Sequence, residues 1–188
     1  MKSTFYLIIF ALLFANCTTT HQFKSVKTQS YTAVGIGCFD GDSPTVKTFA
    51  INDTTVTDTT YHVRLYGIDA PERPSIYVTK RQPGSLEAAE VLRRLVRGKQ
   101  LQIVPVYTDM FDRSVCRVFV DSIDVSVFML KNGHAWFRDE ANMTNSETKQ
   151  LKELQATAKR NKIGLWGLAG TKSNPKTWRK KYSGWKER

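Results

Sequence analysis

The chain has 188 residues, of which 41% are hydrophobic, and it carries 28 Lys and Arg against 17 Asp and Glu. This length accommodates one ordinary domain with tails, and the apolar fraction excludes a wholly disordered chain. The formal net charge of +11 favours a polyanionic partner, with nucleic acid first and an anionic membrane surface second.

The first 17 residues have the features of a signal peptide. Lys2 precedes an apolar run over residues 5–15, which is too short to span a bilayer. Cys17 follows directly, so the segment resembles a bacterial lipoprotein signal, in which the cysteine becomes the lipidated first residue of the mature chain. Secretion with ordinary cleavage nearby is the alternative. Both interpretations predict an exported protein in which the polar residues 18–29 form a tether.

Alternating apolar residues predict five strands in the rest of the chain. They cover residues 31–39, 46–51, a stretch that starts at Val63, 101–106 and 113–120. Between the second and third strands, the Thr- and Asp-rich residues 52–60 predict a solvated hairpin tip.

About three helices are predicted, the clearest over residues 85–97. Ser85 is its expected N-cap, and its apolar face consists of Leu86, Ala89, Leu92 and Val96. The other two helices cover residues 125–131 and 146–162. Five strands with helices between and after them predict an α+β fold, a five-stranded barrel of the oligonucleotide-binding (OB) type, in preference to an open parallel sheet.

Residues 63–72 carry the densest chemistry in the sequence. The strand places Val63 and Leu65 on one face and Arg64 on the other. Asp69 and Glu72 follow within nine residues of the strand start. A guanidinium favours phosphate and two carboxylates favour a hard cation, so this stretch indicates metal-assisted phosphate chemistry.

Three separated motifs together resemble the thermonuclease family, typified by the secreted staphylococcal nuclease. They are Asp40-Gly41-Asp42, Arg64-x4-Asp69-Ala70-Pro71-Glu72 and Asp109-x-Phe111-x-Arg113. The resemblance extends from about residue 31 to residue 166, where the chain closes with Gly164-Leu165-Trp166. It implies a nuclease-like domain over 30–168, followed by a basic tail with interleaved aromatic residues over 169–188.

The resemblance implies a metal site and a base. Asp42 and Asp69 match the two calcium-binding aspartates of the family, and the backbone carbonyl of Ala70 joins them. Glu72 matches the glutamate that orients or deprotonates the attacking water. Carboxylates and a carbonyl are hard oxygen ligands, which suit calcium or magnesium.

The resemblance also implies two phosphate-holding arginines, Arg64 and Arg113. Arg117 is a rival for the second position, but the pattern of Asp, any residue, aromatic, any residue, Arg fits Arg113. Guanidiniums and a divalent ion that meet the charge developing on a phosphodiester stabilise its transition state by several kcal/mol, about 2.7–4 per well-placed donor.

The expected function is therefore that of an exported, calcium-dependent endonuclease, a phosphodiesterase of the hydrolase class. By resemblance it cleaves DNA and RNA with little sequence specificity, prefers single strands, leaves 3′-phosphate ends and acts as a monomer. The alternatives are a non-catalytic nucleic-acid-binding barrel of the OB type, and an envelope lipoprotein that binds anionic polymers.

The residues for substrate contact depart from the type protein. Met110 replaces a lysine and Phe111 a tyrosine where that protein grips the terminal phosphate and base. Trp136 and Phe137 are candidates for stacking on bases, with a place in the core as the alternative. Pro44, just after the Asp-Gly-Asp turn, can reshape the start of the second strand.

Other features allow two interpretations each. The tail, which contains Trp178 and Trp185, can track a phosphate backbone or pack on the barrel. Cys38 and Cys116 are expected as unpaired core thiols, with a disulfide as the alternative. His134 is expected to be structural or solvent-exposed.

Overall fold

The computed structural model describes residues 29–52, 55–170 and 173–184. The predicted signal peptide with Cys17 and nearly all of the predicted tether lie outside these residues. Across the described part of the chain, every helix falls short of the length and apolar character that crossing a membrane requires.

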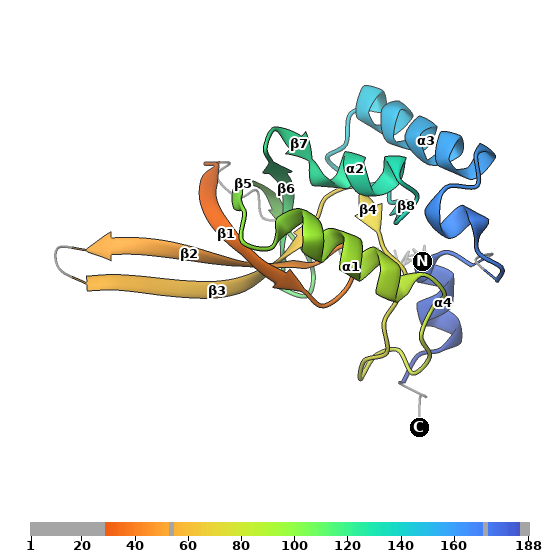
Figure 1. Ribbon diagram of the computed structural model, residues 1–188, viewed down its shortest axis with the longest axis horizontal. Helices are drawn as coiled ribbons and strands as arrows, with labels where there is room; N and C mark the ends of the chain where they lie inside the picture. The colour runs from red at the N-terminus through yellow and green to blue at the C-terminus, as the bar shows by residue number, and fades with distance from the viewer. Residues whose placement is uncertain (1–28, 53–54, 171–172, 185–188) are drawn as a thin grey trace, which may run out of the picture.

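Five strands close into a barrel, as predicted (Figure 1). They are β1 (Tyr31–Cys38), β2 (Pro44–Asn52), β3 (Thr55–Leu65), β5 (Gln100–Thr108) and β6 (Ser114–Val120). The sheet order is β3-β2-β1-β5-β6, and a parallel pairing of β3 with β6 closes it. The fold is therefore the α+β barrel of OB type that the strand count predicts.

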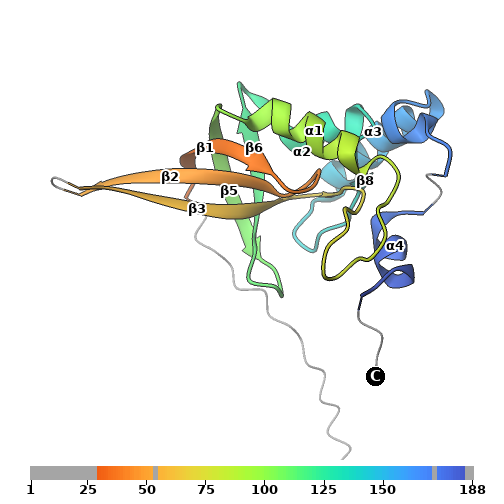
Figure 2. The same ribbon diagram turned by 60° about the horizontal axis from the view of Figure 1, so that its bottom comes forward.

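One strand boundary differs from the prediction. Residues 52–60 were expected as a hairpin tip, but residues 55–60 belong to β3, and the pairing of β2 with β3 continues to Asn52 opposite Thr55. The Thr and Val residues of this stretch are β-branched and favour a pleated strand over a loop. The result is a long two-stranded arm that extends from the barrel (Figures 1 and 2).

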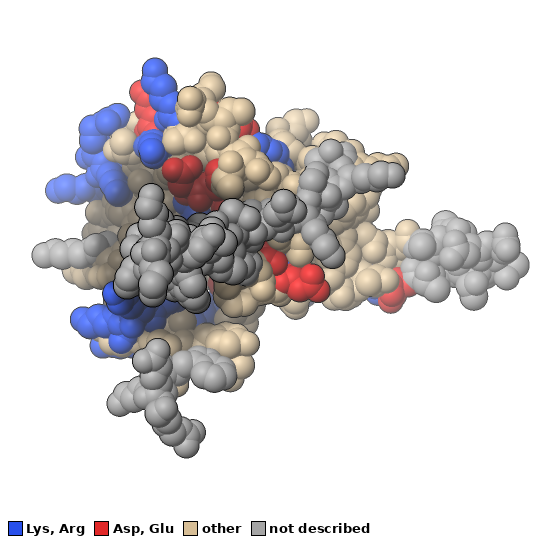
Figure 3. All heavy atoms as spheres, turned by 180° about the vertical axis from the view of Figure 1, so that it is seen from behind, with Lys and Arg blue, Asp and Glu red and all other residues tan. Residues whose placement is uncertain are grey.

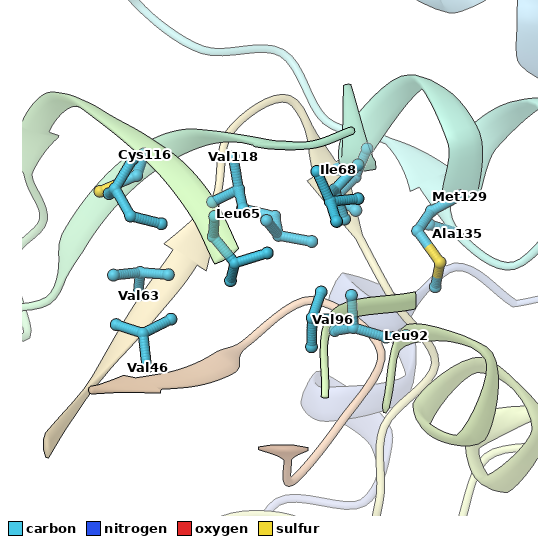
Figure 4. Close-up of a cluster of buried hydrophobic side chains, with 14 of the residues drawn as sticks. Val46, Val63, Leu65, Ile68, Leu92, Val96, Cys116, Val118, Met129 and Ala135 are labelled. Atoms are coloured by element: carbon cyan, nitrogen blue, oxygen red, sulfur yellow. The ribbon is translucent and has the colours of Figure 1, made fainter. Parts of the chain in front are cut away.

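Inward side chains of the strands and of the helices packed on them form the core (Figure 4). Val46, Val63 and Leu65 alternate with outward residues and are fully buried, as period-2 strands require. Leu92 and Val96, from the helix that covers the barrel, are equally buried against them. Pro44 opens β2 opposite Cys38, so the strand simply starts at the proline.

In the described residues, four α-helices accompany the barrel: α1 (Ser85–Val96), α2 (Val125–Lys131), α3 (Asn145–Arg160) and α4 (Pro175–Lys181). A short 3-10 helix covers Gly164–Gly167, and three two-residue strands are β4 (Ile68–Asp69), β7 (Ile123–Asp124) and β8 (Trp136–Phe137). The first three helices match the prediction closely. Helix α4 lies in the predicted tail and is an addition to it.

Two details of α1 correct the prediction. Its N-cap is Gly84, in the left-handed conformation with φ 80°, and Ser85 is the first helical residue. Leu86, expected on the inner face, is 50% exposed, because the buried face is formed by Ala88, Ala89, Leu92 and Val96. The helix thus starts one residue earlier than its polar cap signal suggests.

Candidate active site

The carboxylates predicted to act together come from different elements. Asp42 lies in the bend between β1 and β2, and its carbonyl accepts a hydrogen bond of 2.9 Å from the N–H of Leu65 in β3. Gly41 permits this approach: a Cβ there would lie 2.7 Å from the Cβ of Ala88 and 2.9 Å from that of Ala70. The bend is thereby held against the end of β3.

Arg64 connects the two aspartates from the middle of the site. Its Nη1 pairs with Oδ1 of Asp42, and its Nη2 donates to Oδ1 of Asp69 at 2.8 Å. The N–H of Ala70 donates to the other oxygen of Asp42 at 2.5 Å. All three charged side chains are buried, so the pairing offsets the cost of removing their charges from water.

In this cluster, the carboxylates outnumber the guanidiniums that face them. Burial and the charge of Asp42 raise the pKa of Asp40 to about 7. Burial raises the pKa of Glu72 as well, opposed by Arg179 and reinforced by Asp42 and Asp69. Burial alone would raise the pKa of Asp42, but the charge and hydrogen bonds it receives, chiefly from Arg64, lower it. The site therefore favours additional positive charge.

The chemistry of these donors fits a hard divalent cation. Asp42, Asp69 and the carbonyl of Ala70 offer oxygen atoms only, as calcium and magnesium prefer. Burial and the neighbouring carboxylates raise the pKa of Asp40 and of Glu72 by disfavouring their charged forms, and such an ion would offset both effects. In the present geometry, however, no group of three or more His, Cys, Asp or Glu among the described residues is arranged as a metal site.

Arg179 is a member of the site that sequence reasoning missed. Its Nη2 lies 2.9 Å from Oδ2 of Asp69, and its Nη1 donates to Oδ1 of Asp69 at 3.1 Å and also to Oε1 of Glu72. It belongs to α4, in the stretch expected as a tail. The interleaved Trp and Arg of that tail were the signal, but composition does not show where the arginine points.

Arg113 pairs with the aspartate of its own motif. Its Nε and Nη2 donate to Oδ2 of Asp109 at 2.9 and 2.7 Å, and its guanidinium lies 5.4 Å from the ring centre of Phe111. The rival Arg117 pairs with Glu147 of α3 and covers the ring of Tyr66. The structure thus gathers Asp42, Arg64, Asp69, Ala70 and Glu72, and it holds Arg113 at the β5–β6 turn.

The aromatic candidates divide between core and surface. Trp136 is buried and meets Trp166 edge-on with ring centres 5.0 Å apart, so of its two alternatives the structure shows the place in the core. Phe137 packs partly against the same core. Met110 and Phe111, in contrast, are 79% and 70% exposed at the tip beside Arg113.

The fold is a closed OB-type barrel, and at its strand ends it carries two buried carboxylates paired with a buried guanidinium. These features define a class of protein suited to phosphate and cation chemistry. A family model described as staphylococcal nuclease homologue matches residues 62–167. The chain belongs to this family, as its motifs predict. Helix α4 starts at Pro175 and lies beyond the matched residues.

Curated relatives carry nuclease names. A probable endonuclease LCL3 of Komagataella phaffii is 40% identical over 117 residues, which cover 58% of this chain and 50% of that protein. A probable endonuclease lcl3 of Schizosaccharomyces japonicus is 31% identical over 140 residues, or 69% and 59% of the two chains. A probable staphylococcal-like nuclease CAN3 of Oryza sativa is 30% identical over 139 residues, or 74% and 34%. The chain spans less than two thirds of the length of each.

Proposed function

We propose that the protein is a calcium-dependent nuclease that hydrolyses phosphodiester bonds of DNA and RNA with little sequence specificity. The observation that carries the proposal is that Arg64 is buried between Asp42 and Asp69 and pairs with both. Glu72 joins the same cluster, because Arg179 pairs with both Glu72 and Asp69. Family membership and the names of the relatives support the same activity.

Each residue of the cluster has a role in the proposal. Asp42, Asp69 and the Ala70 carbonyl hold the ion, which supplies Lewis-acid stabilisation of phosphoryl oxygens when it is bound. Glu72 orients water and accepts its proton, and its raised pKa brings it closer to the working pH of a general base.

Arg64 binds the phosphate. Its buried Nε donates to no acceptor among the described residues. A buried unsatisfied donor is costly, and a phosphate oxygen would satisfy it. Arg113 stays a predicted second phosphate ligand, and in that role a substrate has to compete with Asp109 for it.

The remaining parts of the proposal rest on the sequence. They are export from the cell, attachment through a lipidated Cys17 or plain secretion, a preference for single strands, 3′-phosphate products and a monomeric state. Mass spectrometry of the mature N-terminus distinguishes the lipidated form from the secreted one.

Digestion of single-stranded DNA tests the activity. We expect cleavage with calcium and none with a chelator, and the Glu72→Gln variant should lose about 10²–10⁴-fold in kcat because the general base is removed. Glu153→Gln, on the exposed side of α3, loses the same charge away from the site and should cleave like the wild type. Calcium-independent binding of DNA without digestion would instead indicate the non-catalytic barrel.

A further inference from the structure

Helix α4 is attached by its tryptophan to the loop between β4 and α1. Asn174 caps the helix by accepting a hydrogen bond from the N–H of Thr177, and Pro175 occupies the first turn. Trp178 is buried, donates from Nε1 to the carbonyl of Lys80 at 2.8 Å and packs on Tyr182 with ring centres 4.4 Å apart. A buried aromatic with a satisfied polar atom gives a short helix a defined position.

The loop that α4 contacts is the one that leads from Glu72 to α1. The N–H of Thr79 donates to the carbonyl of Tyr182 at 2.9 Å. Gln82 is 1% exposed, and its side chain accepts from the N–H of Glu72 at 3.0 Å and donates to the carbonyl of Ser173 at 2.8 Å. Figures 1 and 2 both show α4 beside this loop. The backbone of Glu72 and the start of the C-terminal segment are thus joined through one buried amide.

This attachment directs Arg179 into the site. Trp178 faces the loop, and the next residue reaches Asp69 with two nitrogens and Glu72 with one of them. The guanidinium therefore contacts both Asp69, the predicted metal ligand, and Glu72, the predicted base. A planar fork with two parallel bonds to a carboxylate is the geometry that arginine provides and lysine does not.

Exposure separates Arg179 from the other arginine of the cluster. The side chain of Arg64 is 6% exposed and that of Arg179 is 38% exposed, so Arg179 lies on the solvent side. Figure 3 shows Lys and Arg gathered at the end of the molecule that carries α3 and α4. A polyanion that approaches this end meets Arg179 before it meets Arg64.

We propose that Arg179 is a substrate-contacting residue of the nuclease site, a second guanidinium that binds the phosphodiester and is supplied by a helix outside the family domain. The inference rests on the proposed function and adds a residue to it. Glu72 alone can retain Arg179 through Nη1, which frees Nη2 for a phosphate oxygen. Arg113, the arginine that the motif predicts, is meanwhile bound to Asp109.

Kinetics of Arg179→Ala and Arg179→Lys test the proposal on the full chain. Loss of one donor to the transition-state charge should lower kcat/KM of the alanine variant by about 10²–10³-fold, mainly in kcat. The lysine variant keeps the charge without the fork and should recover part of this loss. Arg94→Ala, on the exposed side of α1, removes the same charge elsewhere and should leave kcat/KM unchanged.

Binding of thymidine 5′-phosphate gives a readout that needs no turnover. Titration calorimetry in calcium should show a dissociation constant at least about tenfold weaker for Arg179→Ala, because a charge-assisted hydrogen bond to phosphate is lost. Arg94→Ala should bind like the wild type. Arg179→Lys provides both measurements should the alanine variant fail to fold.

The outcomes separate the two proposals. If the wild type cleaves DNA but Arg179→Ala equals it or exceeds it in activity, the arginine only blocks the carboxylates and the present inference is overturned. Unchanged affinity for thymidine 5′-phosphate overturns it as well. If the wild type itself does not cleave with calcium, it is the proposed nuclease function that fails, and the binding result still decides whether Arg179 contacts phosphate.

Discussion

At the scale of single residues, the site depends on charges that neutralise each other only in combination. Arg64 satisfies parts of Asp42 and Asp69, and Arg179 satisfies the remainder of Asp69 together with Glu72. Removal of one partner from such a buried set leaves an uncompensated charge. Substitutions here are therefore expected to affect stability as well as activity, and each needs a control of matched charge.

His134 is a buried residue outside this cluster. It is 9% exposed, and its Nδ1 has no hydrogen-bond partner among the described residues. Burial lowers its pKa from the ordinary value of 6.5, and the charge of Glu87 opposes this only in part. The unfolded chain thus takes up the proton first as the pH falls. The stability that the neutral His134 contributes above pH 6.5 is consequently lost as the pH falls from 6.5 to the lower pKa of this residue in the folded protein.

This dependence can be measured as a difference between two proteins. The free energy of unfolding of the wild type minus that of His134→Leu should fall by up to about 1.4 kcal/mol per pH unit below 6.5. Titrating groups common to both proteins, such as Asp40, cancel in the difference. Urea unfolding at several pH values provides the data, and a difference that does not change with pH would refute a buried neutral imidazole.

At the scale of elements, the position of α4 is expected to depend chiefly on the buried side chain of Trp178. Trp178 contributes its buried ring and its bond to Lys80, and the remaining residues of the helix are mostly exposed. The seven-residue helix is too short to be stable alone, so its position depends on tertiary contacts, of which the buried Trp178 is the largest side chain.

Trp178→Ala should release α4 and leave the barrel folded. Replacement of a buried tryptophan by alanine typically costs about 3–5 kcal/mol, which exceeds what a short helix retains without its contact. Limited trypsin digestion should then cut at Lys176 or Lys180 well before it cuts within the barrel, and activity should fall as it does for Arg179→Ala. Thr177→Ala, on the exposed side of the same helix, should remain resistant. Equal resistance of Trp178→Ala would show that other contacts hold the helix.

At the scale of the whole molecule, the net charge of +11 and the basic end near α3 and α4 (Figure 3) favour nonspecific attraction of polyanions. Binding of nucleic acid should therefore weaken with salt, with log K falling by about 0.7 per neutralised phosphate for each unit of log salt on single strands.

The salt dependence is best measured without cleavage. Anisotropy of a fluorescent single-stranded oligonucleotide with Glu72→Gln protein and calcium, between ~50 and ~200 mM salt, should give a straight line of negative slope. An affinity that is the same at both ends of this range would show that charge does not drive binding, and it would leave the aromatic side chains as the main source of affinity.

Much of the fold follows from local pattern. The alternation in β1 and β6 and the exact bounds of α2 were predictable, because period-2 and helical spacing depend on neighbouring residues. Residues 52–60 were not, since Thr and Asp suit both a loop and an exposed strand, and the partner strand decides. Likewise, no local signal separates a buried Trp136 from a base-stacking one.

The sequence by itself determined the family, the barrel and the carboxylates near Arg64, because motif spacing and strand period are properties of short segments. Only the tertiary structure decided which arginines face those carboxylates. Arg113 lies four residues from Asp109 and pairs with it locally, whereas Arg179 is 110 residues from Asp69 and reaches it only because Trp178 attaches α4 to the loop after Glu72. A contact across such a separation depends on packing, which no spacing within the chain encodes.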